Sequence, residues 1–359
     1  MILTQVGIRH VRNLEDVDIS PVPGLNLVYG ANASGKTSLL EAIHLLAHAR
    51  SFRSSHIESV IGHDQASLLV TGEVYDPGSE IRHRLGVERS RQNTRLRLNQ
   101  QDVRQSSSLA QLLPIQLLTP ESMRLLEQGP SQRRRFLDWG LFHVEPTFHR
   151  AWRDYARALK QRNAALRSGM DPQRIRAWDQ AVIENGVQID RLRHEYAQAL
   201  TPVVQDLCVS LLGFAPHFVY RSGWRQGLEL EAALEQAFER DRQQGSTTVG
   251  PHRAELTCLM DGAAVQERFS RGQLKLLVSA MRLAQAVHLA RRQGKNPVFL
   301  VDDLAAELDP QRRGAVLDAL RGMDCQVFIT ATDRNLLDIS GWEASRMFHV
   351  EHGKIAEVV

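Results

Sequence analysis

A short stretch near the amino terminus restricts the fold more than any other part of the chain. Residues 30–46 read GANASGKTSLLEAIHLL and follow the apolar run LNLVYG. Gly30, Gly35, Lys36 and Thr37 match the spacing G-x-x-x-x-G-K-[ST], with an apolar strand before the glycines and an amphipathic helix after them. A strand, a glycine-rich loop and a helix in this order predict a phosphate-binding loop in an α/β fold.

The residue types in this loop indicate what it binds. Glycine lets backbone N–H groups wrap a phosphate, and the positive end of the helix dipole favours an anion there. Lys36 supplies a compact charge for β- and γ-phosphates, and Thr37 offers a hydroxyl to Mg²⁺. A glycine turn that only caps a helix is the alternative, and the combined pattern and context argue against it. The predicted phosphate-binding residues are Gly30, Ala31, Asn32, Ala33, Ser34, Gly35, Lys36 and Thr37.

A second apolar strand ends in two carboxylates. In VFLVDDL, residues 298–304, four apolar residues precede Asp302 and Asp303. We expect Asp302 to hold Mg²⁺ and Asp303 to orient or deprotonate an attacking water, with Lys36 assisting at the phosphates. Strands that end in acids are common, so the functional interpretation depends on the loop at residues 30–37.

The spacing of apolar residues along the chain changes twice, from strand-like to helical and back to a mixture of both. Strand-like segments occupy residues 2–30 and continue as antiparallel hairpins up to about residue 104, whereas residues 121–213 have helical spacing throughout. After a helix at 272–292, strands and helices alternate again. We therefore predict an α/β domain built from residues 1–117 and 273–359, with a mostly helical insertion at 118–272.

Composition excludes several classes of protein. No stretch approaches the roughly 20 apolar residues that cross a bilayer, and no signal peptide is evident, so a cytoplasmic location is expected. Cys208, Cys258 and Cys325 are widely spaced, which favours buried thiols over a zinc site or disulfides. The net charge of +3 is too small to identify a nucleic-acid partner.

Further motifs resemble those of known ATPases. FSRGQLKLLVSAMRLAQAVHLA at residues 269–290 resembles the signature motif of ABC-type ATPases, and AAELD at 305–309 resembles their D-loop. Ser270 and Gln273 also fit an ordinary helix-capping pattern. Capping alone does not explain why loop, signature, acidic strand and D-loop follow in this order, which is typical of that class.

Within the class, the chain most resembles the RecF family of bacterial recombination and gap-repair proteins. The resemblance rests on the stretches GANASGKTSLLEAIHLLAHARSFRS, TPESMRLLEQGPSQRRRFLDWGLFH, YARALKQRNAAL, TTVGPHRAEL, FSRGQLKLLVSAMRLAQ and VFLVDDLAAELD. It implies a fold like the heads of the SMC family, with a compact helical arm in place of a long coiled coil. It also implies that ATP and Mg²⁺ close two copies into a homodimer.

The resemblance assigns roles to further residues. The signature residues would contact the ATP held by the partner, and Thr330 stands where such ATPases have a switch residue. Arg12 and Asn13 resemble a nucleotide-contacting loop of related heads. The signature residues are Ser270, Arg271, Gly272 and Gln273.

Three departures from the general ABC pattern bear on mechanism. The signature reads SRGQ, so Arg271 adds a charge at the dimer nucleotide. Asp303 replaces the usual glutamate, and its shorter reach predicts slow hydrolysis suited to a switch. Ala33 stands where glycine is common and costs roughly 1–2 kcal/mol if its φ is positive. Gln116 is the nearest candidate for a Q-loop glutamine, or is a plain strand residue.

Arginine-rich segments are candidates for DNA binding. The alternation in TRLRLN places Arg95 and Arg97 on one face of a strand, as a row suited to phosphates or as a solubilising face. Arginines at a helix start oppose the helix dipole, which indicates an anionic partner or an internal acidic neighbour for Arg133, Arg134 and Arg135. The segment HRAWRDYARALKQRN at residues 149–163 carries a further basic series on one helical face, Arg150, Arg153, Arg157 and Lys160. We assign the aromatic residues that flank it, Trp152 and Tyr155, to the core.

The preferred interpretation is an ATP-gated dimer that binds DNA without sequence preference at single-strand gaps. The resemblance adds recombinase loading, replication recovery and SOS induction, with RecR as a partner and RecO in the same pathway. Alternatives are an ATP-switched scaffold for recombination mediators, a transporter ATPase subunit and an SMC-type cohesion factor. No heptad arms or membrane-coupling surface are evident, which argues against the last two.

Overall fold

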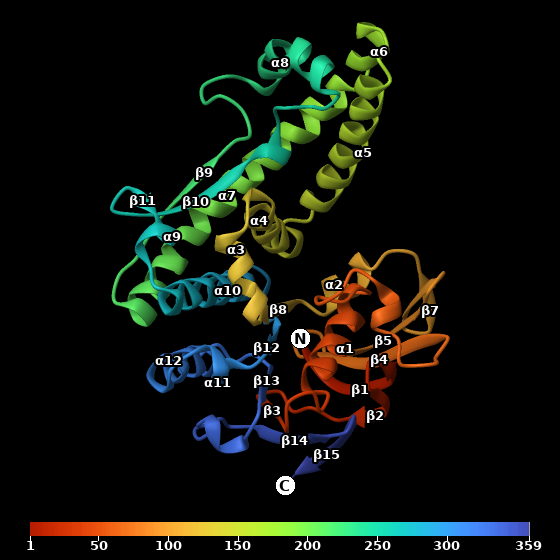
Figure 1. Ribbon diagram of the computed structural model, residues 1–359, viewed down its shortest axis with the longest axis vertical. Coiled ribbons are helices and arrows are strands. Elements are labelled where there is room, and N and C mark those ends of the chain that lie inside the picture. Colours follow the sequence, from red (N-terminus) through yellow and green to blue (C-terminus); the bar gives the residue numbers. More distant parts are fainter. Residues whose placement is uncertain (359) are drawn as a thin grey trace. The chain divides into compact units, whose positions relative to one another are not determined.

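In a computed structural model, which describes residues 1–358, the chain forms two compact units. The first comprises Met1–Ser122 together with Met281–Val359, and the second comprises Met123–Ala280. Helix α10 (Arg271–Gln293) begins in the second unit and ends in the first (Figure 1). Both ends of the chain therefore contribute to one unit, and the middle forms the other.

A mostly parallel sheet organises the first unit. Its order is β15 (Lys354–Val358), β14 (Ser345–Glu351), β3 (Leu25–Tyr29), β13 (Val327–Ala331), β12 (Val298–Val301) and β8 (Ile115–Leu118). All neighbours are parallel except β14 and β15. Because β13 lies between β3 and β12, the segments that follow these three strands meet at one edge of the sheet.

An antiparallel sheet forms the other layer of this unit. Its order is β2 (Leu14–Ile19), β1 (Ile2–Val11), β4 (Ser67–Asp76), β5 (Ile81–Ser90), β6 (Thr94–Leu98) and β7 (Gln101–Val103). Helix α1 (Lys36–His48) packs against strands of both sheets, and its apolar side chains join theirs in one core. This burial holds the loop that precedes α1 at the edge of the parallel sheet.

Shorter helices complete the first unit. They are α2 (Ser107–Leu112), α11 (Leu304–Glu307) and α12 (Pro310–Arg321). Single 3₁₀ turns occupy Ile57–Ser59, Pro120–Met123 and Arg334–Leu336.

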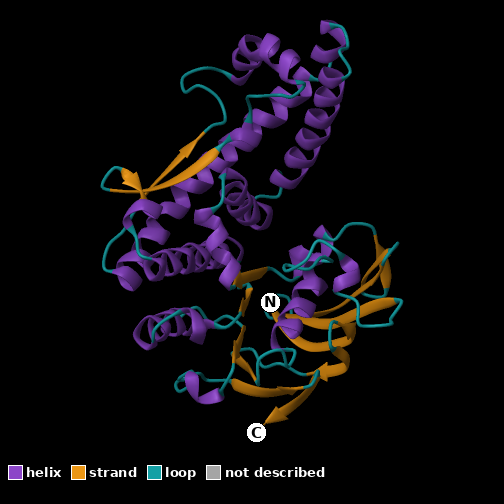
Figure 2. Cartoon of the chain, in the orientation of Figure 1, coloured by secondary structure: helices purple, strands orange, loops and turns teal. Residues whose placement is uncertain are grey.

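The second unit is mostly helical (Figure 2). Its helices are α3 (Arg124–Glu127), α4 (Pro130–Val144), α5 (Phe148–Arg167), α6 (Pro172–Arg176), α7 (Asp179–Leu212), α8 (Leu230–Gln244) and α9 (Val265–Arg268). A small antiparallel sheet joins β11 (Ala263–Ala264), β10 (Glu255–Met260) and β9 (His217–Arg221). The segment TTVGPHR before β10 contains a 3₁₀ turn, Pro251–Arg253.

The strands around the glycine-rich loop and the hairpins after it form as predicted, as does the helix after the signature motif. The three cysteines are buried free thiols, in agreement with the sequence. Within residues 1–358, none of the helices combines the length and hydropathy needed to span a membrane.

Candidate functional site

The glycine-rich loop closes on its own lysine. The Nζ atom of Lys36 donates hydrogen bonds to the carbonyls of Gly30 and Ala31, each at 2.8 Å. A side chain at Gly30 would place its Cβ 2.2 Å from the carbonyl oxygen of Val350, so only glycine fits there. Ala33 has φ 62°, in the left-handed region, so the backbone strain considered for an alanine at this position is present.

Polar groups outside the loop fix its shape. The Asn13 side chain donates to the carbonyl of Ser34 at 2.9 Å and accepts from the hydroxyl of Ser38 at 3.1 Å. The N–H of Gly353, in the turn between β14 and β15, donates to the same Ser34 carbonyl at 2.9 Å. Asn13 thus lies beside the glycine-rich loop, and the contribution of the carboxyl-terminal hairpin has no signal in the sequence.

Arg12 is engaged with a buried carboxylate. Its Nε and Nη2 atoms donate to the two oxygens of Glu41, both at 2.9 Å, and the Glu41 side chain has no exposed surface. Ser51 also donates to Glu41, and Arg53 lies 3.7 Å from it. Glu41 therefore joins Arg12 and the segment after α1 to the helix that follows the glycine-rich loop. The sequence signal for this contact is a single acid, Glu41, within the apolar run SLLEAIHLL.

Asp302 contacts Thr37 of the glycine-rich loop and Thr330 of β13. Both of its carboxylate oxygens accept from the hydroxyl of Thr37 at 3.1 Å, although the two residues are far apart in sequence. Thr330 on β13 donates to Asp302 at 2.7 Å and accepts from the N–H of Asp303 at 2.8 Å. The order of the parallel strands β3, β13 and β12 thus brings together four residues, one of which, Thr330, stands at the expected switch position. They are Thr37, Asp302, Asp303 and Thr330.

The electrostatics fit a cation and phosphates at this place. Burial raises the pKa of Asp302, while the hydroxyls of Thr330 and Thr37 lower it and Asp303 raises it further. Burial lowers the pKa of Lys36, against the attraction of Asp303 and Asp302. A bound Mg²⁺ would offset the repulsion between the carboxylates, and phosphates would replace the carbonyls that now accept from Lys36.

The donor set also fits a magnesium nucleotide. The first N–H groups of α1 have no partner within the helix, and the buried hydroxyl of Ser34 has no hydrogen-bond partner among the described residues. Within residues 1–358, three or more His, Cys, Asp or Glu side chains nowhere gather to hold a metal. The Thr37 hydroxyl and the Asp302 carboxylate are oxygen donors in contact with each other, and Mg²⁺ prefers such donors together with phosphate oxygens.

The signature residues cap a long helix. The N–H of Ser270 donates to Oε1 of Gln273 at 2.8 Å, and the N–H of Gln273 donates to the Ser270 hydroxyl at 3.3 Å. The capping pattern recognised in the sequence is therefore present locally. Ser270 and Arg271 are exposed at the start of α10, and Gly272 is half-buried. An exposed helix start of this kind can receive an anion from another molecule.

Gln116 is a strand residue. Its side chain is buried and donates to Gln285 of α10 at 3.1 Å. On β8 it pairs with Phe299, three residues before Asp302, which separates their backbones by about 10 Å along the strands. The structure favours the plainer of the two interpretations of this glutamine.

The predicted arginine patches differ in their surroundings. Arg133 bonds Glu255 at 2.7 Å and donates to carbonyls at the end of α3, while Arg134 donates to the carbonyl of Ala254 at 2.9 Å. Arg135 is exposed. For Arg133 the internal acidic neighbour, and not an anionic partner, therefore explains why an arginine begins α4. Of the three arginines considered for DNA binding, Arg133 and Arg134 are thus engaged within the unit, and only Arg135 is exposed.

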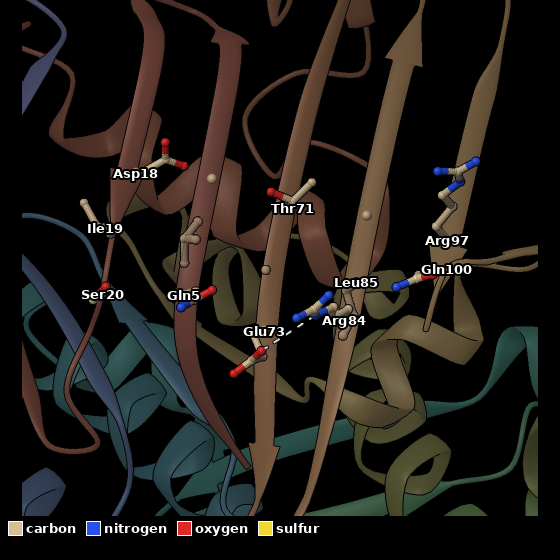
Figure 3. A pocket seen from close by; sticks show the side chains of 14 residues that line it. Gln5, Asp18, Ile19, Ser20, Thr71, Glu73, Arg84, Leu85, Arg97 and Gln100 are labelled. Carbon is tan, nitrogen blue, oxygen red and sulfur yellow. Dashed lines mark ion pairs between the residues drawn. The ribbon is translucent and has the colours of Figure 1, made fainter.

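Arg95 and Arg97 share one face of β6, with Leu96 buried on the other, as the alternation predicted. Both arginines bond Asp102, at 3.2 Å and 3.1 Å. Arg97 also borders a hollow of about 520 Å³ on the open face of the antiparallel sheet, where Asp18, Glu73 and Arg84 project as well (Figure 3). Arg95 and Arg97 share one carboxylate, so their positive charge is only partly neutralised.

Comparison with known proteins identifies the family. A family model described as RecF/RecN/SMC N terminal domain matches residues 2–356. "DNA replication and repair protein RecF" of Thioalkalivibrio sulfidiphilus is 42% identical over 358 residues, covering 99% of each chain. Its counterpart in Shigella flexneri is 43% identical over 360 residues, covering 99% of this chain and 100% of the relative. The chain belongs to the RecF family.

Solved structures agree with this RecF assignment. The recombination mediator protein RecF with ATP, of the RecFOR pathway, has a TM-score of 0.89 and 25% identity, covering 99% of this chain and 97% of that one. An SMC head bound to a domain of ScpA has a TM-score of 0.62 and 13% identity, covering 100% of this chain and 98% of that one. The predicted ABC-type, SMC-head-like fold with a mostly helical insertion is therefore confirmed.

Proposed function

We propose that this RecF-family protein is an ATP-gated DNA clamp of recombinational repair. Two copies would sandwich two ATP molecules, with Ser270 of each copy facing the γ-phosphate held by Lys36 and Thr37 of the other. The observation that carries the proposal is the hydrogen-bonded set of Thr37, Asp302 and Thr330 beside a glycine loop closed on Lys36. A capped and exposed signature helix supports the dimer.

Each residue has a defined role in this proposal. Backbone N–H groups of residues 32–37 and Lys36 would bind the phosphates, while Thr37 and Asp302 would hold Mg²⁺. When bound there, Mg²⁺ would supply charge neutralisation at the β- and γ-phosphates. Asp303 would accept a proton from the attacking water. The backbone N–H of Asp303 donates to Thr330, and this bond would hold Asp303 in place. Slow hydrolysis would then release the dimer, which makes ATP a switch.

In the cell we assign the dimer to single-strand gaps in DNA. The relatives carry the name of a DNA replication and repair protein, and similar solved structures are called recombination mediators of the RecFOR pathway. We extend these names to this chain: it would help load the recombinase together with RecR and RecO, and support replication recovery and SOS induction. Action on chromosomal DNA would place it in the cytoplasm.

Light scattering tests the dimer directly. The mass of the wild-type chain, 40.5 kDa, is expected to double with Mg-ATP, and gapped DNA is expected to be retained only under that condition. Lys36→Ala and Ser270→Arg should each remain monomeric. Ser131→Arg, at an exposed serine in the first turn of α4, is the matched control and should dimerise like the wild type.

A wild-type monomer in saturating Mg-ATP would contradict the clamp. If such a monomer still binds RecR in an ATP-dependent manner, the chain is an ATP-switched scaffold.

A further inference from the structure

Helix α5 presents a basic face that none of the assigned roles uses. The helix packs beside α7 in the second unit (Figure 1). Its buried positions recur every three or four residues and define one side that faces the core. At about 100° per residue, Arg153, Arg157 and Lys160 lie on the opposite side. The buried positions are Phe148, Ala151, Tyr155, Ala158, Arg162, Ala165 and Leu166.

The outer side of α5 is cationic along its whole length. We name it the α5 basic face and define it by five exposed residues: Arg150, Arg153, Arg157, Lys160 and Arg167. Asp154 is the one carboxylate of the helix and lies 3.8 Å from Arg150 and 3.5 Å from Arg153. A face that serves only solubility would carry both signs, as the surface around Arg97 does.

Three of these cations lack a carboxylate partner. In the described part of the chain, residues 1–358, Arg157, Lys160 and Arg167 make no ion pair. Arg95 and Arg97, by contrast, share Asp102, whose pKa they lower. The α5 basic face therefore carries uncompensated positive charge, whereas the row on β6 is partly neutralised.

The dimensions of this face match a polyphosphate. From Arg150 to Arg167 the helix rises about 26 Å. Duplex DNA carries one charge per roughly 1.7 Å, so about 15 phosphates span that length. Arginine and lysine contact phosphates without reading sequence, in keeping with a protein that acts at gaps wherever they arise.

From these observations we propose that the α5 basic face binds the backbone of duplex DNA, at the double-stranded flank of a gap. The proposal rests on the DNA-binding part of the proposed function and names a surface for it. An acidic segment of a partner protein is the other polyanion that this face would accept. The continuous charge over about 26 Å favours the duplex.

Two double variants with the same change in net charge test the assignment. Arg157→Glu with Lys160→Glu reverses the α5 basic face at its centre. Arg174→Glu with Arg225→Glu reverses two exposed arginines of the same unit outside that face. Affinity for a gapped duplex is measured by fluorescence anisotropy in Mg-ATP over a series of salt concentrations, after melting curves and light scattering establish folding and mass.

The α5 variant is expected to lose about tenfold or more in affinity, and its salt dependence should fall by about 2 in the slope of log K against log salt. The control pair should stay within about twofold of the wild type. Equal losses in both pairs would reflect net charge alone and overturn the assignment, as would an α5 variant with unchanged affinity and slope.

The readouts also separate this inference from the proposed dimer. A wild type that stays monomeric in Mg-ATP refutes the dimer, while DNA binding that depends on α5 alone would still stand. A wild type that dimerises in Mg-ATP but binds no gapped DNA refutes the α5 assignment and the DNA-binding part of the proposed function, and leaves the dimer standing.

Discussion

Asp303 follows the carboxylate that bonds Thr37, and its backbone N–H is fixed on Thr330. Asp303→Asn keeps the size of the side chain but removes the base. We expect ATP hydrolysis to fall about 100-fold or more, within the range for a lost general base, while ATP-dependent dimers persist. Phosphate release and light scattering measure the two effects. Asp324→Asn, at an exposed carboxylate of the same unit, should leave both unchanged.

Ala33 adopts φ 62° in the glycine-rich loop, a backbone conformation that costs an alanine roughly 1–2 kcal/mol. Ala33→Gly removes this strain but adds freedom to the unfolded chain, so the free energy of unfolding should change by less than about 1 kcal/mol. ATP affinity should be retained. Ala33→Val, with a branched side chain, should weaken both. Urea unfolding and nucleotide titration check this, and a glycine variant that fails to bind ATP would contradict it.

Among the elements, the segment before β10 is tied to three helices by buried polar groups. Arg162 of α5 bonds Asp179 of α7 at 2.7 Å and Asp241 of α8 at 2.8 Å, and it donates to the hydroxyl of Thr247 at 2.8 Å. Arg162, Asp241 and Thr247 are all buried. One guanidinium therefore joins two helices and the TTVGPHR segment to α5.

Removing Arg162 should be costly because it leaves the buried Asp241 without its cation. We expect Arg162→Ala to lower the free energy of unfolding by about 3–5 kcal/mol. Arg176 bonds Glu235 at 2.6 Å, and both side chains are largely exposed. Arg176→Ala is the control and should cost less than about 1 kcal/mol. Similar losses in urea unfolding of the two variants would contradict the burial argument.

His252 makes the same region sensitive to acid. Its Nδ1 atom lies 2.6 Å from the Tyr155 hydroxyl, and its Nε2 atom lies 3.0 Å from the carbonyl of Thr247. Burial, together with the charges of Arg253 and Arg134, lowers the pKa of His252 to about 4, although the Thr247 carbonyl and Asp241 raise it. The unfolded chain therefore binds a proton more readily, so this stability is complete above pH 6.5 and is lost as pH falls towards 4.

The size of that loss is about 3 kcal/mol for His252. The glutamine in His252→Gln does not bind a proton. The unfolding free energy of this variant should therefore be lower than that of the wild type at pH 7 and should fall less than the wild-type value on acidification. The gap to the wild type should then close by about 3 kcal/mol near pH 4. Chemical unfolding at several pH values measures it, and parallel curves would refute the role of this histidine.

Local patterns in the sequence predict local parts of the site. The strand, the glycine loop and the helix follow from spacing alone, and Asp302 follows from an apolar run that ends in acids. Contacts between distant segments are different, because they depend on how the strands are ordered. Gly353 supporting Ser34, and Glu255 pairing with Arg133, have no counterpart in residue spacing. Of the two aromatic residues assigned to the core, Tyr155 is buried, but Trp152 is 44% exposed, so its assignment was wrong.

In the whole molecule, the two halves of the proposed ATP site belong to different units. Residues 30–37 and Asp302 lie in the first unit, and the signature residues 270–273 lie in the second. If a nucleotide first binds one copy and then closes the dimer, the two places should become protected in two stages. Binding to the first unit requires one chain, whereas protection of the signature requires two.

Hydrogen exchange with mass spectrometry resolves these stages. In Mg-ATP, backbone N–H groups of residues 30–37 should be protected at every protein concentration. Residues 270–273 should be protected only when the chain is concentrated enough to dimerise, since association depends on mass action. Ser270→Arg should keep the first protection and lose the second, and Lys36→Ala should lose both. Protection of the signature at high dilution would mean that ATP acts on it within one chain, and the sandwich arrangement would be wrong.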